Sequence, residues 1–247
     1  MRILLAIVLL VSSQAYSQSQ YTDSLFQAYI KSDMKQWKRV IDQMQAHSFN
    51  QNQVEFTAEL VNYQYGYVAW HIGNDLEDEA EKYLDLAIEN LEWLEENNFD
   101  EASTLAYWAA FYGFRIGINT WYVTLYGYKC NSSAEKAVEI DSANPFCHIQ
   151  MANLRYYQPP ILGGSLQEAI DYYLKAESIY LTRPIKDRNR DWIYLNLLAT
   201  IASFYTEFKD YPKAKVYYEK LLNIQPNYDW VKLKMLPDLI EKMNAVE

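Results

Sequence analysis

The side chains that could perform chemistry in this sequence are few and scattered. The 247 residues include three histidines, His47, His71 and His148, and two cysteines, Cys130 and Cys147. No second histidine or cysteine stands at metal-ligand spacing from any of the histidines, and neither HExxH nor GxSxG occurs. We therefore expect a protein that is not an enzyme and that holds no metal and no cofactor, although catalysis by carboxylates brought together only on folding stays open.

Charged residues form local clusters of each sign. The acidic cluster opens a predicted helix, where carboxylates favour the positive end of the helix dipole, and we interpret it as a solvated helix face: Asp75, Glu77, Asp78, Glu79 and Glu81. The basic run follows a proline and is interleaved with aspartates: Arg183, Lys186, Arg188 and Arg190. We interpret this run as an exposed linker, and an anion-binding role is the alternative.

Aromatic residues are the compositional outlier, with 23 Tyr, 9 Phe and 7 Trp. In a predicted helix over 51–72, one face is aromatic or apolar at helical spacing and should be core: Phe56, Leu60, Tyr63, Tyr67 and Trp70. Tyr65 lies on a second face, so this helix is either covered on two sides or lines a groove. Because a buried tyrosine hydroxyl must be hydrated or paired, a tyrosine-rich concave surface is the functional hypothesis that we favour.

The clearest repeat signal lies between Trp192 and Pro226, where two amphipathic halves meet at Lys209-Asp210. Asp210 is a good N-cap, and Pro212 stands in the first turn of the second helix, where its missing N–H costs nothing. This segment resembles a tetratricopeptide repeat at Tyr205, Tyr211, Ala214, Tyr218 and Pro226. The resemblance implies an all-α solenoid of antiparallel helix pairs, a right-handed superhelix of about four to five degenerate repeats.

Other segments repeat the small, large, small spacing of such helix pairs, at Ala80, Leu84 and Ala87 and at Ala169, Tyr173 and Ala176. We predict helices over 22–31, 34–47, 51–72, 75–98, 101–119, 121–129, 133–141, 145–157, 165–181, 190–208, 211–224 and 228–244. The break between 129 and 133 rests on Ser132 and Glu135, which have the spacing of a capping box.

A glycine-rich loop follows the predicted helix 145–157. It consists of Pro159 and Pro160, which stop that helix, Gly163 and Gly164, which allow positive φ, and Ser165, an N-cap for the next helix. A wide turn between helices explains these residues without a ligand. The segment from Tyr126 to Tyr180 resembles the T component of TRAP transporters and related secreted proteins, a family with Pro-x-x-x-Gly-Gly-[Asp/Ser] at this point. That resemblance implies a small-molecule-binding accessory of a transporter.

The tetratricopeptide resemblance also implies which first-helix residues face the concave side. On the helix 145–157 the expected groove residues are Phe146, Ile149, Asn153, Tyr156 and Tyr157. We add Tyr65, which lies on the second face of the helix 51–72. In the last repeat the same positions are Asn196, Ala199, Ser203, Thr206 and Glu207. We expect this aromatic groove to bind a protein or peptide partner. The alternative is a small amphipathic ligand, as in the TRAP T component.

The first residues have the order of a secretory signal peptide, with Arg2, a nine-residue apolar run from Ile3 to Val11, and a small polar stretch. We expect a signal peptide over 1–17 with cleavage after Ala15 or Ser17, and a single helical repeat domain over 18–247. No cysteine near the apolar run could carry a lipid anchor, so a periplasmic or secreted location follows. The net charge of −10 disfavours nucleic acid and anionic membranes as partners.

The two cysteines test the predicted geometry. In an oxidising compartment a disulfide between Cys130 and Cys147 is one possibility. Antiparallel neighbouring helices place Cys147 beside residues near Ile140 instead, with the two Cα atoms about 10–15 Å apart, against the ~7 Å limit for a disulfide. We therefore expect two free thiols.

Overall fold

The computed structural model describes residues 20–51 and 54–245, and the predicted signal peptide lies outside them. Within this part of the chain the regular structure is helical and no strand occurs, so the all-α prediction is confirmed. No helix among these residues is both long and apolar enough to cross a membrane.

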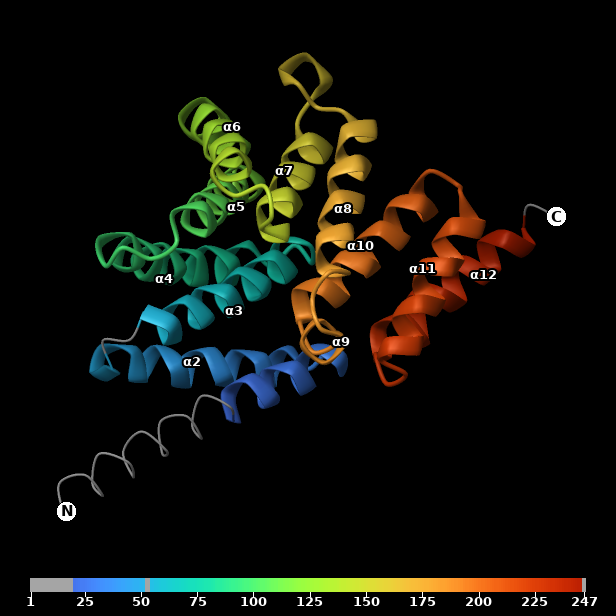
Figure 1. Cartoon of the computed structure of the whole chain (residues 1–247), viewed down its shortest axis with the longest axis horizontal. Helices are drawn as coiled ribbons and strands as arrows, with labels where there is room; N and C mark the ends of the chain where they lie inside the picture. The colour runs from blue at the N-terminus through green and yellow to red at the C-terminus, as the bar shows by residue number, and fades with distance from the viewer. Residues whose placement is uncertain (1–19, 52–53, 246–247) are drawn as a thin grey trace.

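The helices follow one another round an arc, coloured from blue to red in Figure 1. The first half contains a helix over 20–30 and then α2 (Met34–Gln51), α3 (Val54–Ile72), α4 (Glu77–Glu96), α5 (Glu101–Ile118), the 3₁₀ turn η1 (Thr120–Tyr122) and α6 (Val123–Ile140). The second half contains α7 (Pro145–Tyr157), the 3₁₀ turn η2 (Pro160–Leu162), α8 (Leu166–Tyr180), α9 (Ile185–Arg188), α10 (Trp192–Glu207), α11 (Tyr211–Ile224), the π-helical turn η3 (Val231–Met235) and α12 (Leu236–Asn244).

Helix α6 is continuous, so the predicted break between 129 and 133 is wrong. Cys130, Ala134 and Ala137 follow helical spacing and are all buried, and the Cys130 thiol donates to the carbonyl of Ala109 in α5 at 3.2 Å. Burial of one face of α6 against α5 therefore outweighs the local capping signal, and Ser132 and Glu135 lie inside the helix.

The closest helix pairs are α3 with α4, α5 with α6, α7 with α8, and α10 with α11. Small residues stand where these helices approach, and the fully buried ones include Ala80, Ala87, Ala134, Ala169, Ala176 and Ala214. A larger side chain at these positions would force the helix axes apart, which explains the small residues at matched spacing.

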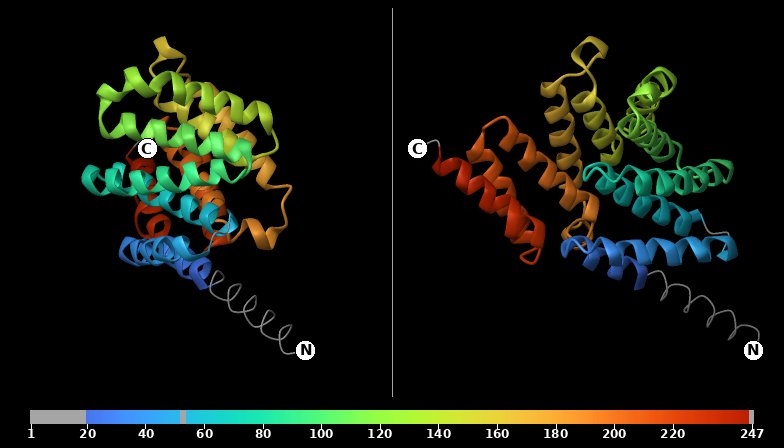
Figure 2. Two further views of the ribbon diagram at one scale, coloured as in Figure 1. Left: turned by 90° about the vertical axis from the view of Figure 1, so that its left-hand side faces the viewer. Right: turned by 180° about the vertical axis from the view of Figure 1, so that it is seen from behind.

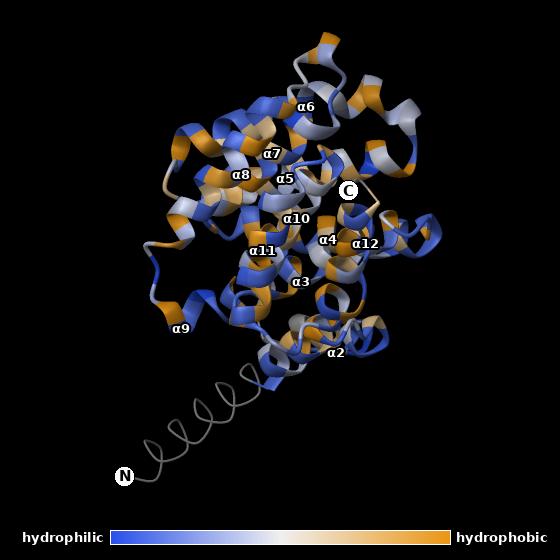
Figure 3. Ribbon diagram, turned by 90° about the vertical axis from the view of Figure 1, so that its right-hand side faces the viewer, coloured by the Kyte–Doolittle hydropathy of each residue, from blue (hydrophilic) through white to orange (hydrophobic). Residues whose placement is uncertain are grey.

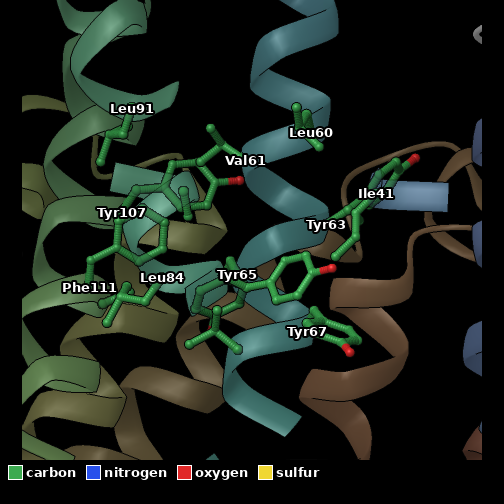
Figure 4. Close-up of a cluster of buried hydrophobic side chains, with 14 of the residues drawn as sticks. Ile41, Leu60, Val61, Tyr63, Tyr65, Tyr67, Leu84, Leu91, Tyr107 and Phe111 are labelled. Carbon is green, nitrogen blue, oxygen red and sulfur yellow. The ribbon is translucent and has the colours of Figure 1, made fainter. Parts of the chain in front are cut away.

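The core has two large clusters, one in each half of the chain. The first is rich in rings and aliphatic side chains from α2 to α5, part of which Figure 4 shows around Tyr65 and Tyr107. The second joins α7, α8, α10 and α11 to the C-terminal segment. Trp192, at the start of α10, belongs to the first cluster although its helix belongs to the second, so it joins the two halves.

The first described helix packs against the segment that follows α11. The Tyr228 hydroxyl donates to the Tyr29 hydroxyl at 2.6 Å, and the Lys31 ammonium lies 3.3 Å from the Asp229 carboxylate. Figure 2 shows the blue N-terminal helices beside the red C-terminal ones in both of its views. The arc of helices is thus closed by contacts between its first and last parts.

The loop between α7 and α8 has the backbone that its glycines allow. Gly163 has φ of 100°, in the left-handed region, and a Cβ at Gly164 would lie 1.7 Å from the carbonyl oxygen of Gln158. The Ser165 hydroxyl accepts a hydrogen bond from the Glu168 amide at 3.2 Å and so caps α8. The Arg155 guanidinium holds the loop from α7, since it donates to the Gly163 carbonyl at 3.1 Å.

Candidate functional site: a tyrosine-lined pocket

The second half of the chain contains a pocket of ≈ 220 Å³, which we call the tyrosine pocket. Tyr156 and Tyr157 at the end of α7, Tyr173 of α8 and Trp230 each contribute to its lining. The rest of the lining comes from α10: Asn196, Ala199, Thr200, Ser203, Phe204 and Glu207.

Local sequence explains how these side chains are presented. Helix α7 stops at Tyr157 because the residue before Pro159 is driven into an extended conformation, and Gln158 has ψ of 136°. Helix α10 is capped at its start by Asp191, whose carboxylate accepts from the Ile193 amide at 2.8 Å. Asn196, Ala199, Ser203 and Glu207 then recur at intervals of three and four residues, so one face of α10 lines the pocket.

Aromatic rings form one wall. The rings of Tyr156 and Tyr157 lie 4.8 Å apart, edge to face at 84°, and Tyr156 lies 6.1 Å from the ring of Phe204. Tyr157 is 79% exposed and stands at the rim. Such an arrangement offers ring faces and edges to a flat apolar ligand.

The one carboxylate of the pocket is engaged by a phenol. The Tyr156 hydroxyl donates a hydrogen bond to Glu207. Partial burial and then the Glu207 carboxylate raise the pKa of Tyr156 above its ordinary value, because both disfavour the phenolate. Tyr156 is therefore a neutral phenol at physiological pH, and its hydroxyl donates a hydrogen bond to Glu207.

Polar groups of neighbouring helices fix the deeper part of the pocket. The Tyr173 hydroxyl donates to the side-chain oxygen of Asn153 at 2.6 Å, and the hydroxyls of Ser203 and Tyr218 are 3.2 Å apart. Burial raises the pKa of Tyr173 well above its ordinary value. These bonds satisfy the buried hydroxyls within the protein and orient the rings, so the pocket is preformed.

Trp230 reaches the pocket from a segment remote from α7 in sequence. It directly precedes the π-helical turn η3, and π turns often occur at functional sites, where the extra residue redirects side chains. The neighbouring Tyr228 is held by Tyr29. The pocket wall thus depends on the contact between the first described helix and the C-terminal segment.

The residues expected to line a groove divide into two groups. Tyr156 and Tyr157 line the pocket, and Asn153 holds one of its lining side chains. Phe146, Ile149 and Tyr65 are each 7% exposed, and the structure places them in the core. Rings surround Tyr65 on several sides, and its hydroxyl accepts from the Gln150 amide at 3.1 Å. The structure therefore shows a compact pocket at the end of α7 and not a continuous aromatic groove along it.

Of the positions expected on α10, Asn196, Ala199, Ser203 and Glu207 line the pocket. The Thr206 hydroxyl instead donates to the carbonyl of Ala202 within the helix. Trp230 lies in the predicted helix 228–244, but sequence reasoning did not assign it to a binding site. Among the described residues there is no group of three or more His, Cys, Asp or Glu side chains that could hold a metal ion.

Comparison with known proteins finds similarity among solved structures alone. No protein-family model matches the chain, and no curated protein matches it. Among solved structures it is similar to the HusA haemophore from Porphyromonas gingivalis, with a TM-score of 0.57 and 16% sequence identity. The match covers 68% of this chain and 80% of the haemophore. At this level of identity the similarity shows a shared helical fold.

Proposed function

We propose that this chain is an exported, non-enzymatic binding protein that holds a small aromatic molecule in the tyrosine pocket. The observation that carries the proposal is the convergence of Tyr156, Tyr157, Phe204 and Trp230 on one pocket. Preformed concave sites lined by aromatic side chains, with a few polar groups to orient the ligand, are typical of small-molecule binding.

Haem or a related tetrapyrrole is the ligand class that we place first. The fold neighbour is a haemophore, and tyrosine is one of the side chains that hold haem iron. The pocket supplies phenols, aromatic faces and, in Glu207, a carboxylate that accepts a hydrogen bond from one of the phenols. No lysine or arginine lines it, so the acidic groups of such a ligand would find no cation in the pocket.

Titration of the mature protein with haemin, followed at the Soret band, tests this assignment. We expect saturable binding that weakens about tenfold in Tyr157→Ala, which removes a ring contact worth roughly 1 kcal/mol in addition to its buried area. Tyr156→Phe keeps the ring and removes only the hydroxyl. Tyr128→Ala is the matched control, because Tyr128 is an exposed tyrosine outside the pocket.

Metal-free protoporphyrin separates the two parts of the proposal. If Tyr156 or Tyr157 holds the iron, haemin binds more tightly than protoporphyrin, and the difference falls in the corresponding variant. If haemin and protoporphyrin bind with equal affinity, the pocket recognises the porphyrin ring and neither tyrosine ligates the iron. If wild type, Tyr156→Phe and Tyr157→Ala all bind haemin with the same affinity, the tyrosine pocket is not the haemin site.

A protein or peptide partner is the second candidate. Large apolar side chains are exposed outside the pocket, notably Trp121, Tyr128 and Ile161, and such a side chain could anchor a partner. Crosslinking of the mature protein in envelope or culture fluid, with Trp121→Ala as the comparison, tests this candidate. A specific polypeptide that is lost in the variant supports it.

The architecture and location complete the proposal. The paired helices and their small interface residues support a tetratricopeptide-like solenoid with a right-handed superhelix of about four to five repeats. We propose that it occupies 18–247 as one domain and acts in the periplasm or outside the cell after removal of the signal peptide. Mass measurement of the exported protein would give the cleavage site.

A further inference from the structure

The lining of the tyrosine pocket carries a net negative charge. Glu207 is its one charged residue, and no lysine, arginine or histidine lines the pocket. Glu207 accepts a hydrogen bond from the neutral Tyr156 phenol and forms no ion pair within the described part of the chain. Figure 3 shows α7, α8 and α10, which supply most of the lining, from the side of the second half of the chain. The pocket thus contains a carboxylate whose charge no cation of the lining balances.

This charge acts on both tyrosines at the end of α7. Burial and then the Glu207 carboxylate raise the pKa of Tyr157, as they do that of Tyr156, because a second negative charge beside Glu207 is unfavourable. A positive charge at the same place is favoured for the same reason. The formal net charge of −10 adds a long-range attraction for cations.

The aromatic rings of the pocket suit a cation as well. The ring planes of Tyr156 and Tyr157 are 84° apart, and those of Tyr156 and Phe204 are 57° apart, so the rings line the pocket in several orientations. Trp230 adds the ring type that attracts cations most strongly. Several rings around one ammonium group form an aromatic cage, in which the negative ring faces attract the positive charge.

The size of the pocket limits what it encloses. Its volume of ≈ 220 Å³ is below the roughly 300–1,000 Å³ of pockets that bury a whole drug-sized ligand. It therefore encloses one end of a ligand, and the remainder extends past Tyr157, which is exposed at the rim. The charge and the rings specify the chemistry of the enclosed end.

We infer that the tyrosine pocket binds the ammonium group of an organic cation. The ammonium lies against the rings and donates to Glu207, whose carboxylate has about four acceptor positions, of which the Tyr156 hydroxyl uses one. The hydroxyl oxygens of Thr200 and Ser203 line the same pocket and are further acceptors. This inference rests on the proposed use of the pocket as a small-molecule site, and it assigns to that pocket a ligand class other than a porphyrin.

Isothermal titration calorimetry at pH 7 and constant ionic strength tests the inference with three probes of similar shape: phenethylammonium, neutral phenethyl alcohol and the anion hydrocinnamate. Wild-type protein binds phenethylammonium at least about tenfold more tightly than the alcohol. In Glu207→Gln this preference falls about tenfold, the loss expected for one hydrogen bond between charged groups. Glutamine keeps an oxygen that accepts from Tyr156, and circular dichroism verifies the fold. Glu219→Gln is the matched control, because it removes the same charge from an exposed position of α11 outside this pocket and leaves the preference unchanged.

Three outcomes would overturn the inference. The alcohol binds as tightly as phenethylammonium, hydrocinnamate binds more tightly than either, or Glu207→Gln keeps the full preference for the cation. Each of these leaves the proposed small-molecule site intact, because the haemin titration measures that site separately. If none of the three probes binds, the inference is also wrong, and haemin binding to wild type and Tyr157→Ala decides the proposed function.

Discussion

At the scale of single residues, Trp192 is the side chain that joins the two halves of the molecule. Its ring lies 5.3 Å from that of Trp37 and 5.7 Å from that of Tyr29, and its indole N–H donates to Asn62 at 2.7 Å. Gly66 in α3 makes room for it, because a Cβ there would lie 2.6 Å from the Trp192 ring and 2.8 Å from that of Trp37. The absence of a side chain at residue 66 thus permits the central aromatic contact.

Gly66→Ala should therefore destabilise the protein by about 1–3 kcal/mol, since two large rings must shift to accept a methyl group. Gly117→Ala is the matched control in α5, where the added Cβ meets only Ile72 at an ordinary 3.6 Å. There the better helix propensity of alanine should stabilise the fold by up to about 1 kcal/mol. Urea unfolding followed by circular dichroism measures both, and equal midpoints for the two variants would contradict the close packing around Trp192.

The reactivity of the two cysteines is also a property of single residues. Both thiols are free and buried, and burial raises the pKa of Cys130 to about 11 and that of Cys147 to about 12. Because the thiolate is the reactive form, we expect almost no reaction with a thiol reagent in the native protein at pH 7, and two equivalents after denaturation without reductant. A monomer that yields no thiol after denaturation, with the two cysteine peptides linked, would contradict the helix arrangement around α6 and α7.

Sequence reasoning identified part of the candidate site and missed the rest for a physical reason. Tyr156 and Glu207 could be found because the tetratricopeptide resemblance implies which positions of each first helix face the concave side. Spacing could not show that other rings cover Tyr65 and Phe146, since these rings come from helices remote in sequence. It could not place Trp230 either, because its position depends on the contact of Tyr228 with Tyr29.

At the scale of elements, local signals located helix ends where backbone chemistry decides them. Helices α7 and α11 have the predicted bounds, 145–157 and 211–224. A proline stands in the first turn of each, and the Asp210 carboxylate accepts from the Lys213 amide at 3.4 Å. The same kind of signal misled at Ser132, because tertiary burial of Ala134 and Ala137 against α5 decides the course of α6.

The pairing of α10 with α11 depends on a small residue at their closest approach. Ala214 is fully buried, so Ala214→Trp should force the helices apart and lower the free energy of unfolding by roughly 1–3 kcal/mol or more. Val216→Trp, on the exposed face of the same helix, should change it by about 0.5 kcal/mol or less. Thermal unfolding distinguishes the two, and a stable Ala214→Trp variant would show that the interface is loosely packed.

At the scale of the whole molecule, contacts between the two ends of the described chain close the arc of helices. Besides Tyr29 with Tyr228, Arg190 pairs with Asp23, and the Tyr29 hydroxyl donates to Asn196 at 3.4 Å. Asn196 lines the tyrosine pocket, so the first helix supports the candidate site. No sequence pattern predicts this closure, since the partners are separated by most of the chain.

The many buried tyrosines make the fold sensitive to alkali. Burial raises the pKa of Tyr29 and of Tyr180 well above the ordinary 10.0. Above about pH 10 the unfolded chain releases protons that the folded chain retains, so unfolding becomes more favourable. The contribution of these tyrosines to stability should be constant below about pH 9 and fall above about pH 10, by up to about 1.4 kcal/mol per pH unit for each such tyrosine.

Urea midpoints at pH 8 to 11, with tyrosinate absorbance recorded on the same samples, measure this effect. We expect the midpoint to fall as the pH passes about 10 and tyrosinate to appear together with unfolding. Tyrosinate that forms fully in a chain with unchanged helical circular dichroism would contradict the burial of these hydroxyls.

Native mass spectrometry of the protein purified from the cells that make it tests the binding proposal most directly. We predict that it retains a small molecule with the absorption of an aromatic chromophore. The doubly substituted chain, Tyr156→Ala with Tyr157→Ala, should lose this molecule while its helical circular dichroism is preserved. A retained polypeptide without any small mass, or a chromophore that persists in the double variant, would contradict the assignment of the tyrosine pocket as the ligand site.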